Sequence, residues 1–254
     1  MTDSMPVLFV AHGAPNILLQ KDPVITEWQA VASALPRPER ILMVSAHWDM
    51  PRHRIGGNRE RQTIHDFRGF PEPLYEYTYA PPADVEYAEV LAAGLGLEID
   101  HERGLDHGAW VPLLAMYPQA DIPVTQLSVS SQLGPAAHLK LGRALAPLRE
   151  QGVLILASGV VVHNLRRLDW QNPHSEPEPW AALFMGEVDA RVRQGAWEDL
   201  IEPQRLPGGD LAVPTPEHYL PLLVAGGAAG KGTVLPFAHE WRYRNLSQHS
   251  YRFD

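Results

Sequence analysis

The sequence predicts an α/β protein with a central, mostly parallel sheet flanked by helices and with long loops over the carboxyl ends of the strands. Short apolar runs alternate along the chain with longer segments of helical periodicity, which is typical of parallel strands joined by crossover helices. Two segments rich in proline and glycine, 50–82 and 165–215, interrupt this alternation, and we expect them to be long ordered loops. Since no linker divides the chain, residues 1–254 are expected to form a single domain.

The expected strands are continuous apolar runs, because a buried parallel strand is apolar on both faces. These runs are 6–11, 40–46, 122–129, 153–157 and, more weakly, 232–237. Apolar residues at helical spacing predict the helices between them. These helices cover 24–35, 82–95, 136–150, 179–194 and 216–229. Pro36 ends the first helix, and Thr215 followed by Pro216 has the residue types of a helix start.

The composition of the chain excludes several classes of function. The 254 residues contain no cysteine, which excludes disulfides, thiolate metal sites and a cysteine nucleophile. The net charge of −9 argues against binding to nucleic acid or to an anionic membrane surface. We find no apolar run of membrane-spanning length and no signal peptide, and therefore expect a cytoplasmic protein. The usual glycine-rich nucleotide motifs and the serine-hydrolase elbow are also missing.

Three of the 12 histidines follow predicted strands. His12 comes directly after the first strand, His47 directly after the second, and His163 a few residues after the fourth. Because the carboxyl ends of parallel strands meet at one edge of a sheet, we expect these side chains to lie together. A single histidine at such a position is more often a hydrogen-bonded loop residue, but three equivalent positions favour a site.

Three further histidines have plausible functional positions. His218 and Glu217 would lie in the first turn of the last helix, where the helix dipole favours the neutral imidazole that binds metals. An exposed histidine at a helix start is an equal alternative. His107, in an Asp-His-Gly turn, and His65, in the first long loop, either have structural roles or point into a pocket.

The remaining histidines have polar or helix-surface neighbours, and we expect no chemical role for them. They are His53, His101, His138, His174, His239 and His249. Several neutral imidazoles without a thiol suit Fe(II), Zn(II), Mn(II) or Cu(II). Ligands contributed by separate strands favour an open catalytic site over a closed structural one.

Several longer segments make the chain resemble the LigB-type (class III) extradiol ring-cleavage dioxygenases, in particular their 4,5-DOPA extradiol dioxygenase branch. The segments are HGAP at 12–15, SAHW at 45–48, IHDFRGFPEPLY at 64–75, GLDHGAW at 104–110, MYPQADIPVTQLSV at 116–129, ASGVVVHNLR at 157–166 and PTPEHYLPLL at 214–223. They occur in the order of the family and cover most of residues 6–225. The stretch 237–254 matches poorly, which leaves the substrate less well defined than the metal site.

The resemblance implies roles for individual residues. His12, His47 and His218 match the metal ligands of this branch. His163 matches an active-site histidine that is either a further ligand or the acid–base residue beside the metal. His107 matches a second catalytic histidine that contacts substrate or oxygen.

Other implied assignments leave alternatives open. Another branch of the family completes its ligand set with a glutamate, so Glu217 is the alternative to the neighbouring His218. His65 and Asp66 are weaker candidates for lining the pocket.

The resemblance implies a catalytic domain that cleaves the ring of a DOPA-like catechol with O2. Fe(II) is the metal expected for activity, and Zn(II) is a plausible bound metal because the same ligands hold it tightly. The expected partners are the small-molecule catechol and O2, and a homo-oligomer is compatible with the sequence. Two other functions remain open: a zinc-dependent hydrolase that uses the same histidines, and a non-catalytic metal-binding or metal-delivery protein.

The aromatic residues of the first long loop bear on that choice. We expect them either to line a substrate pocket or to form a hydrophobic mini-core under the loop. They are Phe67, Phe70, Tyr75, Tyr77 and Tyr79.

Overall fold

The computed structural model describes residues 4–60 and 62–254 and confirms the predicted α/β class with a large, mostly parallel sheet. Eight strands follow the order β4-β3-β5-β2-β6-β1-β10-β7. Their bounds are β1 Val7–Ala11, β2 Arg40–Asp49, β3 Arg54–Gly56, β4 Glu98–Asp100, β5 Val124–Val129, β6 Val153–Gly159, β7 Val234–Phe237 and β10 Ser250–Phe253. Two further strands, β8 (Trp241–Arg242) and β9 (Leu246–Ser247), form a separate short ribbon.

The centre of the sheet is parallel. β5, β2, β6 and β1 are adjacent and run in the same direction, so their carboxyl ends share one edge, as the sequence predicts. β10 is antiparallel to both β1 and β7, and β3 is antiparallel to β5. The antiparallel pairings therefore do not change the common direction of β1, β2 and β6, the three strands that carry the histidine positions.

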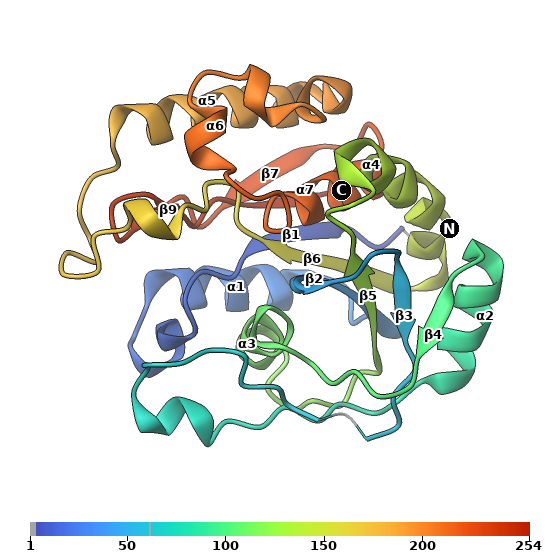
Figure 1. Cartoon of the computed structure of the whole chain (residues 1–254). Coiled ribbons are helices and arrows are strands. Elements are labelled where there is room, and N and C mark those ends of the chain that lie inside the picture. Colours follow the sequence, from blue (N-terminus) through green and yellow to red (C-terminus); the bar gives the residue numbers. More distant parts are fainter. Residues whose placement is uncertain (1–3, 61) are drawn as a thin grey trace.

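Helices cover both faces of the sheet (Figure 1). Their bounds are α1 Pro23–Ala34, α2 Val85–Leu95, α3 His107–Met116, α4 Gly134–Leu145, α5 Pro179–Gln194, α6 Gly209–Ala212 and α7 Leu220–Ala229. α4, α5 and α7 pack on one face and α1 and α3 on the other. β1 illustrates the two cores, because Val7 and Phe9 belong to the first and Leu8 and Val10 to the second.

Close contact between α4 and α7 holds the last helix firmly against the sheet. A Cβ at Gly142 would lie 2.2 Å from the carbonyl oxygen of Val224, and one at Gly227 would lie 2.3 Å from that of Leu139. Only glycine permits this approach of the two backbones. α7 is consequently buried along its whole length, and the turn before it has a defined place beside the sheet.

Several elements differ from the expectation. α3 begins at His107, where a turn was predicted, because Asp106 caps it by accepting a hydrogen bond from the backbone N–H of Ala109. α7 begins at Leu220 and not at 216, so His218 lies in a turn before the helix and not in its first turn. Thr215 does not cap a helix, since its hydroxyl donates to Glu217 instead.

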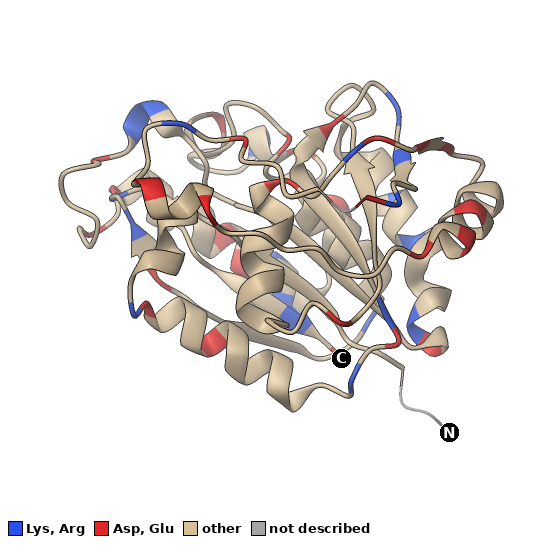
Figure 2. Cartoon of the chain, turned by 90° about the horizontal axis from the view of Figure 1, so that it is seen from below, with Lys and Arg blue, Asp and Glu red and all other residues tan. Residues whose placement is uncertain are grey.

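The two segments expected to be long loops also contain regular elements. β3 and the 3-10 helix Glu72–Tyr75 interrupt 50–82. Segment 165–215 contains α5, which is the helix expected at 179–194, and the short helix α6. Figure 2 shows acidic and basic residues interspersed over the ribbon in this view. Within residues 4–60 and 62–254, no helix combines the length and apolarity that a membrane span requires.

Candidate active site

Three histidines from three separate elements meet at the carboxyl edge of the sheet. His12 follows β1, and its backbone N–H donates to the carbonyl of Gly159 at the end of β6. His47 lies near the end of β2, where the pairing with β5 shifts register between Ser45 and Asp49. The turn before α7 carries His218, whose carbonyl accepts from the N–H of Val160. The close packing of sheet and α7 thus places residues that are far apart in sequence side by side.

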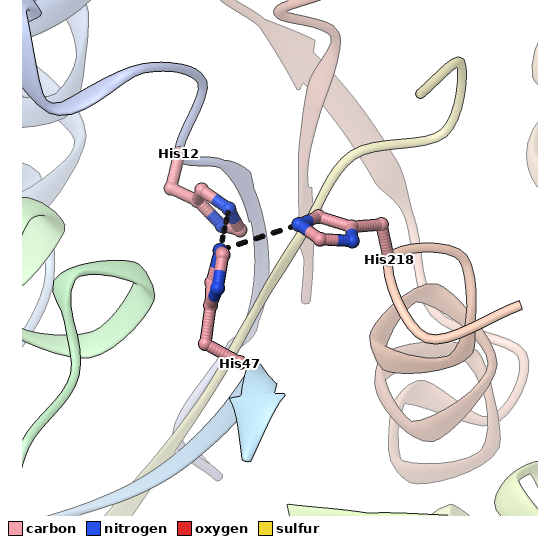
Figure 3. Close-up of side chains that lie close together, drawn as sticks. All are labelled: His12, His47 and His218. Atoms are coloured by element: carbon pink, nitrogen blue, oxygen red, sulfur yellow. Dashed lines mark hydrogen bonds between the residues drawn. The ribbon is translucent and has the colours of Figure 1, made fainter. Parts of the chain in front are cut away.

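The three rings direct the same nitrogen toward a common point (Figure 3). Nε2 of His47 lies 3.1 Å from Nε2 of His12 and 3.2 Å from Nε2 of His218. Two nitrogens that are each about 2.1 Å from one ion, at tetrahedral to octahedral angles, are about 3.0–3.4 Å apart. The separations therefore fit the edges of a metal coordination polyhedron.

The other ring nitrogen of each histidine contacts an oxygen of the protein. Nδ1 of His12 lies 2.8 Å from Oγ of Ser158, and Nδ1 of His218 lies 3.0 Å from Oε1 of Glu217. Nδ1 of His47 lies 3.3 Å from Oδ2 of Asp66. These contacts favour the tautomer with the proton on Nδ1, which leaves the lone pair of each Nε2 free for a metal.

Burial keeps these imidazoles neutral. It is the main cause that lowers the pKa of His12 and of His218 well below the ordinary value, and nearby histidines lower both further. Burial and the proximity of His107 lower the pKa of His47 to about 4, although Asp106 and Asp66 oppose this shift. Neutral imidazole is the form that ligates metals, so the group fits Fe(II) or Zn(II) near neutral pH.

His218 and not Glu217 belongs to the group formed with His12 and His47. Glu217 contacts the outer nitrogen of His218 and thereby orients its ring. The structure thus brings together the three histidines that the sequence singled out as ligands and gives the adjacent carboxylate a supporting position.

His163 lies beside this group without joining it. Its ring stacks on that of His218, with centroids 3.6 Å apart and planes at 11°. Together with Glu217 and His218 it forms a second cluster of ligand-type atoms that excludes His12 and His47. Burial and the neighbouring His218 lower its pKa well below the ordinary value, so its ring is also neutral. This position favours proton transfer beside the metal over direct ligation.

Asp66 connects His107 to the site. Its Oδ1 accepts from both the backbone N–H and Nδ1 of His107, while Oδ2 lies near His47. Burial opposes ionisation of Asp66, but the hydrogen bond and charge of His107 outweigh it and lower the pKa of the carboxyl. Asp66 lines the cavity, as the sequence predicts, and in addition contacts both His107 and His47.

A buried network under His47 was not predicted from the sequence. Asp106 is fully buried and accepts hydrogen bonds from Ser45, Gln126 and Arg103. Arg103 also donates to the backbone carbonyl of His47. The only available signal was the charged Asp106 beside apolar residues, because two of its partners, Ser45 and Gln126, come from strands distant in sequence.

A cavity of about 310 Å³ opens in front of the histidines. Phe67, Phe70 and Trp170 contribute aromatic walls. The complete lining is His12, Gly13, Ala14, Pro15, His47, Asp66, Phe67, Arg68, Phe70, His107, His163, Leu165, Trp170, His218 and Leu246. The aromatic residues of the first long loop therefore serve both expected purposes, since some line the pocket and others form a core under the loop. Tyr75, Tyr77 and Tyr79 do not line the cavity and instead pack in the core under the loop.

Two expectations about the other histidines need correction. His65 does not line the cavity, because its Nε2 contacts the carbonyl of Tyr77 and its ring packs near Trp110. His138 and His53 do not have the polar or helix-surface surroundings expected for them. Both are buried, with ring centroids 4.7 Å apart.

The family and the relatives that this chain resembles are ring-opening dioxygenases, which agrees with the geometry of the site. Residues 6–254 match the family described as the catalytic LigB subunit of aromatic ring-opening dioxygenase. The chain is 42% identical to a 4,5-DOPA dioxygenase extradiol of Escherichia coli K12, over 88% of this chain and 85% of the relative. It is 40% identical to a protein of the same name from Beta vulgaris, over 96% and 95%.

A solved structure supports the same relationship. It is that of an uncharacterized protein from Escherichia coli K12, with 36% identity and a TM-score of 0.85 over 98% of this chain and 100% of that one. The fold and site define an α/β enzyme with three histidines at the carboxyl edge of its sheet that could hold a metal. The chain belongs to the LigB family of aromatic ring-opening dioxygenases.

The C-terminal stretch 237–254, which carries no segment characteristic of the family, lies within the matched residues 6–254. In the structure this stretch supplies β10, which pairs with β1, and Leu246 of the cavity wall.

Proposed function

We propose that this dioxygenase opens the ring of a DOPA-like catechol, with Fe(II) held by His12, His47 and His218. The convergence of three neutral Nε2 atoms is the observation that carries the proposal. The names of the relatives support the substrate class. Zn(II) fits the same donors, so its presence in a preparation is compatible with an iron enzyme. We expect the protein to act in the cytoplasm, alone or as a homo-oligomer.

The cavity suits a small aromatic substrate. A volume of about 310 Å³ lies at the lower end of the range for small-molecule sites, roughly 300–1,000 Å³. Phe67, Phe70 and Trp170 offer ring faces and edges for the catechol. The histidines form the polar end of the cavity, which orients the two hydroxyls toward the metal site.

His163 is the proposed acid–base residue. A bound Fe(II) would acidify the catechol hydroxyls and bring the substrate and O2 together. His163, neutral and stacked against the ligand His218, can accept a catechol proton and return it as the ring opens. Glu217 lies in the same cluster and favours the protonated form of His163 after transfer.

His107 is the proposed second catalytic histidine. Asp66 accepts the hydrogen bond from its Nδ1 and so fixes the orientation of its ring at the cavity wall. Nε2 is then the atom available to hydrogen-bond a substrate hydroxyl or the incoming oxygen. The same carboxylate orients His47, so one side chain couples ligand and substrate-binding positions.

The decisive experiment compares metals and substrates. The protein is reconstituted without oxygen with Fe(II) or Zn(II), and oxygen uptake and ultraviolet–visible spectra are recorded with DOPA, other catechols and tyrosine. We expect the Fe(II) form to consume oxygen with catechols and to form a ring-opened chromophore. Tyrosine, which lacks the second hydroxyl, is the control and should not react. Hydrolysis of esters or amides by the Zn(II) form, without oxygen uptake by the Fe(II) form, would contradict the proposal and support the hydrolase alternative.

A further inference from the structure

Arg68 is an exposed residue on the wall of the active-site cavity, and it forms no ion pair with the part of the chain that the structure describes. Apart from the histidines, Asp66 and Arg68 are the charged residues of the lining. Asp66 is engaged by His107 and His47. Arg68 takes part in none of the ion pairs found among residues 4–60 and 62–254. Its guanidinium is therefore available to a ligand.

The backbone around Arg68 is held in place on both sides. Asp66 precedes it and is tied to His107 by two hydrogen bonds. Phe67 is buried and packs edge-on against His107, with ring centroids 5.6 Å apart. Gly69 has a φ of +78°, which turns the chain so that Phe70 returns to pack on Phe67. Arg68 thus projects from an ordered segment of the cavity wall.

The chemistry of an unpaired arginine in this position points to a carboxylate. A guanidinium presents a planar fork of donors that matches a carboxylate in bidentate geometry. Most of the remaining wall is apolar, with Leu165, Leu246 and Pro15 beside the aromatic residues. The chain carries a net charge of −9, so a substrate carboxylate needs a local positive charge to offset the general repulsion.

We propose that Arg68 is a specificity-determining residue that binds the carboxylate of the catechol substrate and thereby selects catechols that carry a carboxylate over those that lack one. This inference rests on the proposed function, because it assigns the substrate class of the same site.

A second cation near the site is a weaker candidate for this role. A neighbouring pocket of about 240 Å³ shares Ala14 and Trp170 with the cavity and contains Arg242. The guanidinium of Arg242 is already paired with Asp22, at 2.9 Å, and with Glu240. A carboxylate there would meet two negative charges, whereas at Arg68 it meets none that is unpaired.

The test compares three catechols of different side-chain charge on Fe(II)-reconstituted enzyme. They are DOPA, which carries a carboxylate, dopamine, which carries only an ammonium, and neutral 4-methylcatechol. Arg68→Ala should raise KM for DOPA about tenfold or more with little change in kcat, as expected for loss of a charged hydrogen bond. KM for 4-methylcatechol should change less than about twofold, and Arg68→Lys should restore part of the loss. Arg68→Glu should reverse the preference in favour of dopamine.

Two controls keep the result specific. Arg52→Ala removes another exposed arginine of the same long segment that does not line the cavity, and it should leave all three KM values unchanged. Calorimetric binding of DOPA and 4-methylcatechol to the Zn(II) form measures the same selectivity without turnover. A binding ratio that depends on Arg68 supports the inference even if no catechol is oxidised, in which case only the proposed function fails.

The inference is overturned if Arg68→Ala leaves the ratio of DOPA to 4-methylcatechol affinities unchanged. It is also overturned if both affinities fall equally, since that result would indicate a structural role. A loss of DOPA selectivity in Arg242→Lys, with normal selectivity in Arg68→Ala, would instead assign the carboxylate to the neighbouring pocket.

Discussion

Two groups of buried histidines in this protein differ in what their ring nitrogens contact. His53 and His138 pack edge-on, and burial lowers the pKa of both, that of His138 to about 4. Nδ1 of His138 contacts the carbonyl of Gly134, and Nε2 accepts from the N–H of Ser130. Both nitrogens of His138 are thus used by the backbone, and among the described residues neither histidine belongs to a three-ligand cluster.

The histidines at the sheet edge are also neutral, with His12 and His218 buried and His47 half-buried, and each leaves one nitrogen without a backbone partner. Nε2 of His53 likewise has no hydrogen-bond partner, but among the described residues it belongs to no three-ligand cluster. In His12, His47 and His218, Nδ1 is held by a side-chain oxygen and Nε2 points to the shared centre. Burial and a lowered pKa are therefore common to both groups. The direction of the second nitrogen is what distinguishes a metal site from a structural pair.

The strongest test of this distinction removes a ligand. His12→Ala or His47→Ala should lower metal affinity more than about 100-fold, which exceeds the usual effect of losing a supporting partner. Oxygen uptake with catechol should be lost with the metal. Metal content after gel filtration, measured by mass spectrometry, checks the expectation. Full occupancy in both variants would contradict the ligand assignment.

The next largest effect is expected from replacing His163, which lies beside the three proposed metal ligands and is not one of them. His163→Ala should retain the metal but lower kcat about 10²–10⁴-fold, the usual contribution of a general acid–base residue. Metal content and kcat are measured on the same preparation. A near-normal kcat would remove His163 from proton transfer, whereas loss of metal would make it a ligand.

A smaller effect is expected from the carboxylates that hold the outer nitrogens. Asp66→Asn and Glu217→Gln should each weaken metal binding about 10–100-fold, because the rings of His47 and His218 lose their orienting charge. Competition with a chelator gives the affinities. Glu72→Gln, an exposed carboxylate outside the cavity, is the matched control and should bind metal normally. Unchanged affinity in both site variants would show that the carboxylates do not support the ligands.

The smallest effect should come from the structural pair. His138→Ala leaves the N–H of Ser130 without its acceptor, which should lower the free energy of unfolding by about 1–3 kcal/mol. Thermal unfolding measures the loss, while metal content and kcat per bound metal should stay normal. A variant with normal stability but impaired metal binding would reverse the roles of the two regions.

The same variant has a distinct pH dependence. The pKa of His138 is lowered from 6.5 to about 4, so between these values the unfolded chain binds a proton that the folded chain does not. The contribution of neutral His138 to stability is complete above pH 6.5 and is lost as the pH falls toward 4. Denaturant unfolding at several pH values should therefore show a shallower decline for His138→Ala than for the unmodified protein. Parallel declines would exclude this role of His138.

Much of the fold follows from local sequence pattern. The apolar runs that became β1, β2, β5 and β6 were long enough to be recognised, and the helices between them had clear periodicity. β3, β4 and β10 were missed because each is only three or four residues long and is held mainly by pairing with neighbouring strands. α3 was missed because it is buried on nearly all sides and lacks an amphipathic pattern.

The sequence by itself determined which residue types were available and where most of them would lie. It has no thiol, and three of its 12 histidines follow the ends of parallel strands, so a histidine site at that edge could be predicted. Only the tertiary structure decided that His218 and not Glu217 faces the centre, and that His138 is buried elsewhere. The reason is that a ring is oriented by partners distant in sequence, such as Ser158 for His12, 146 residues away. Such contacts exist only once the sheet and α7 have packed together.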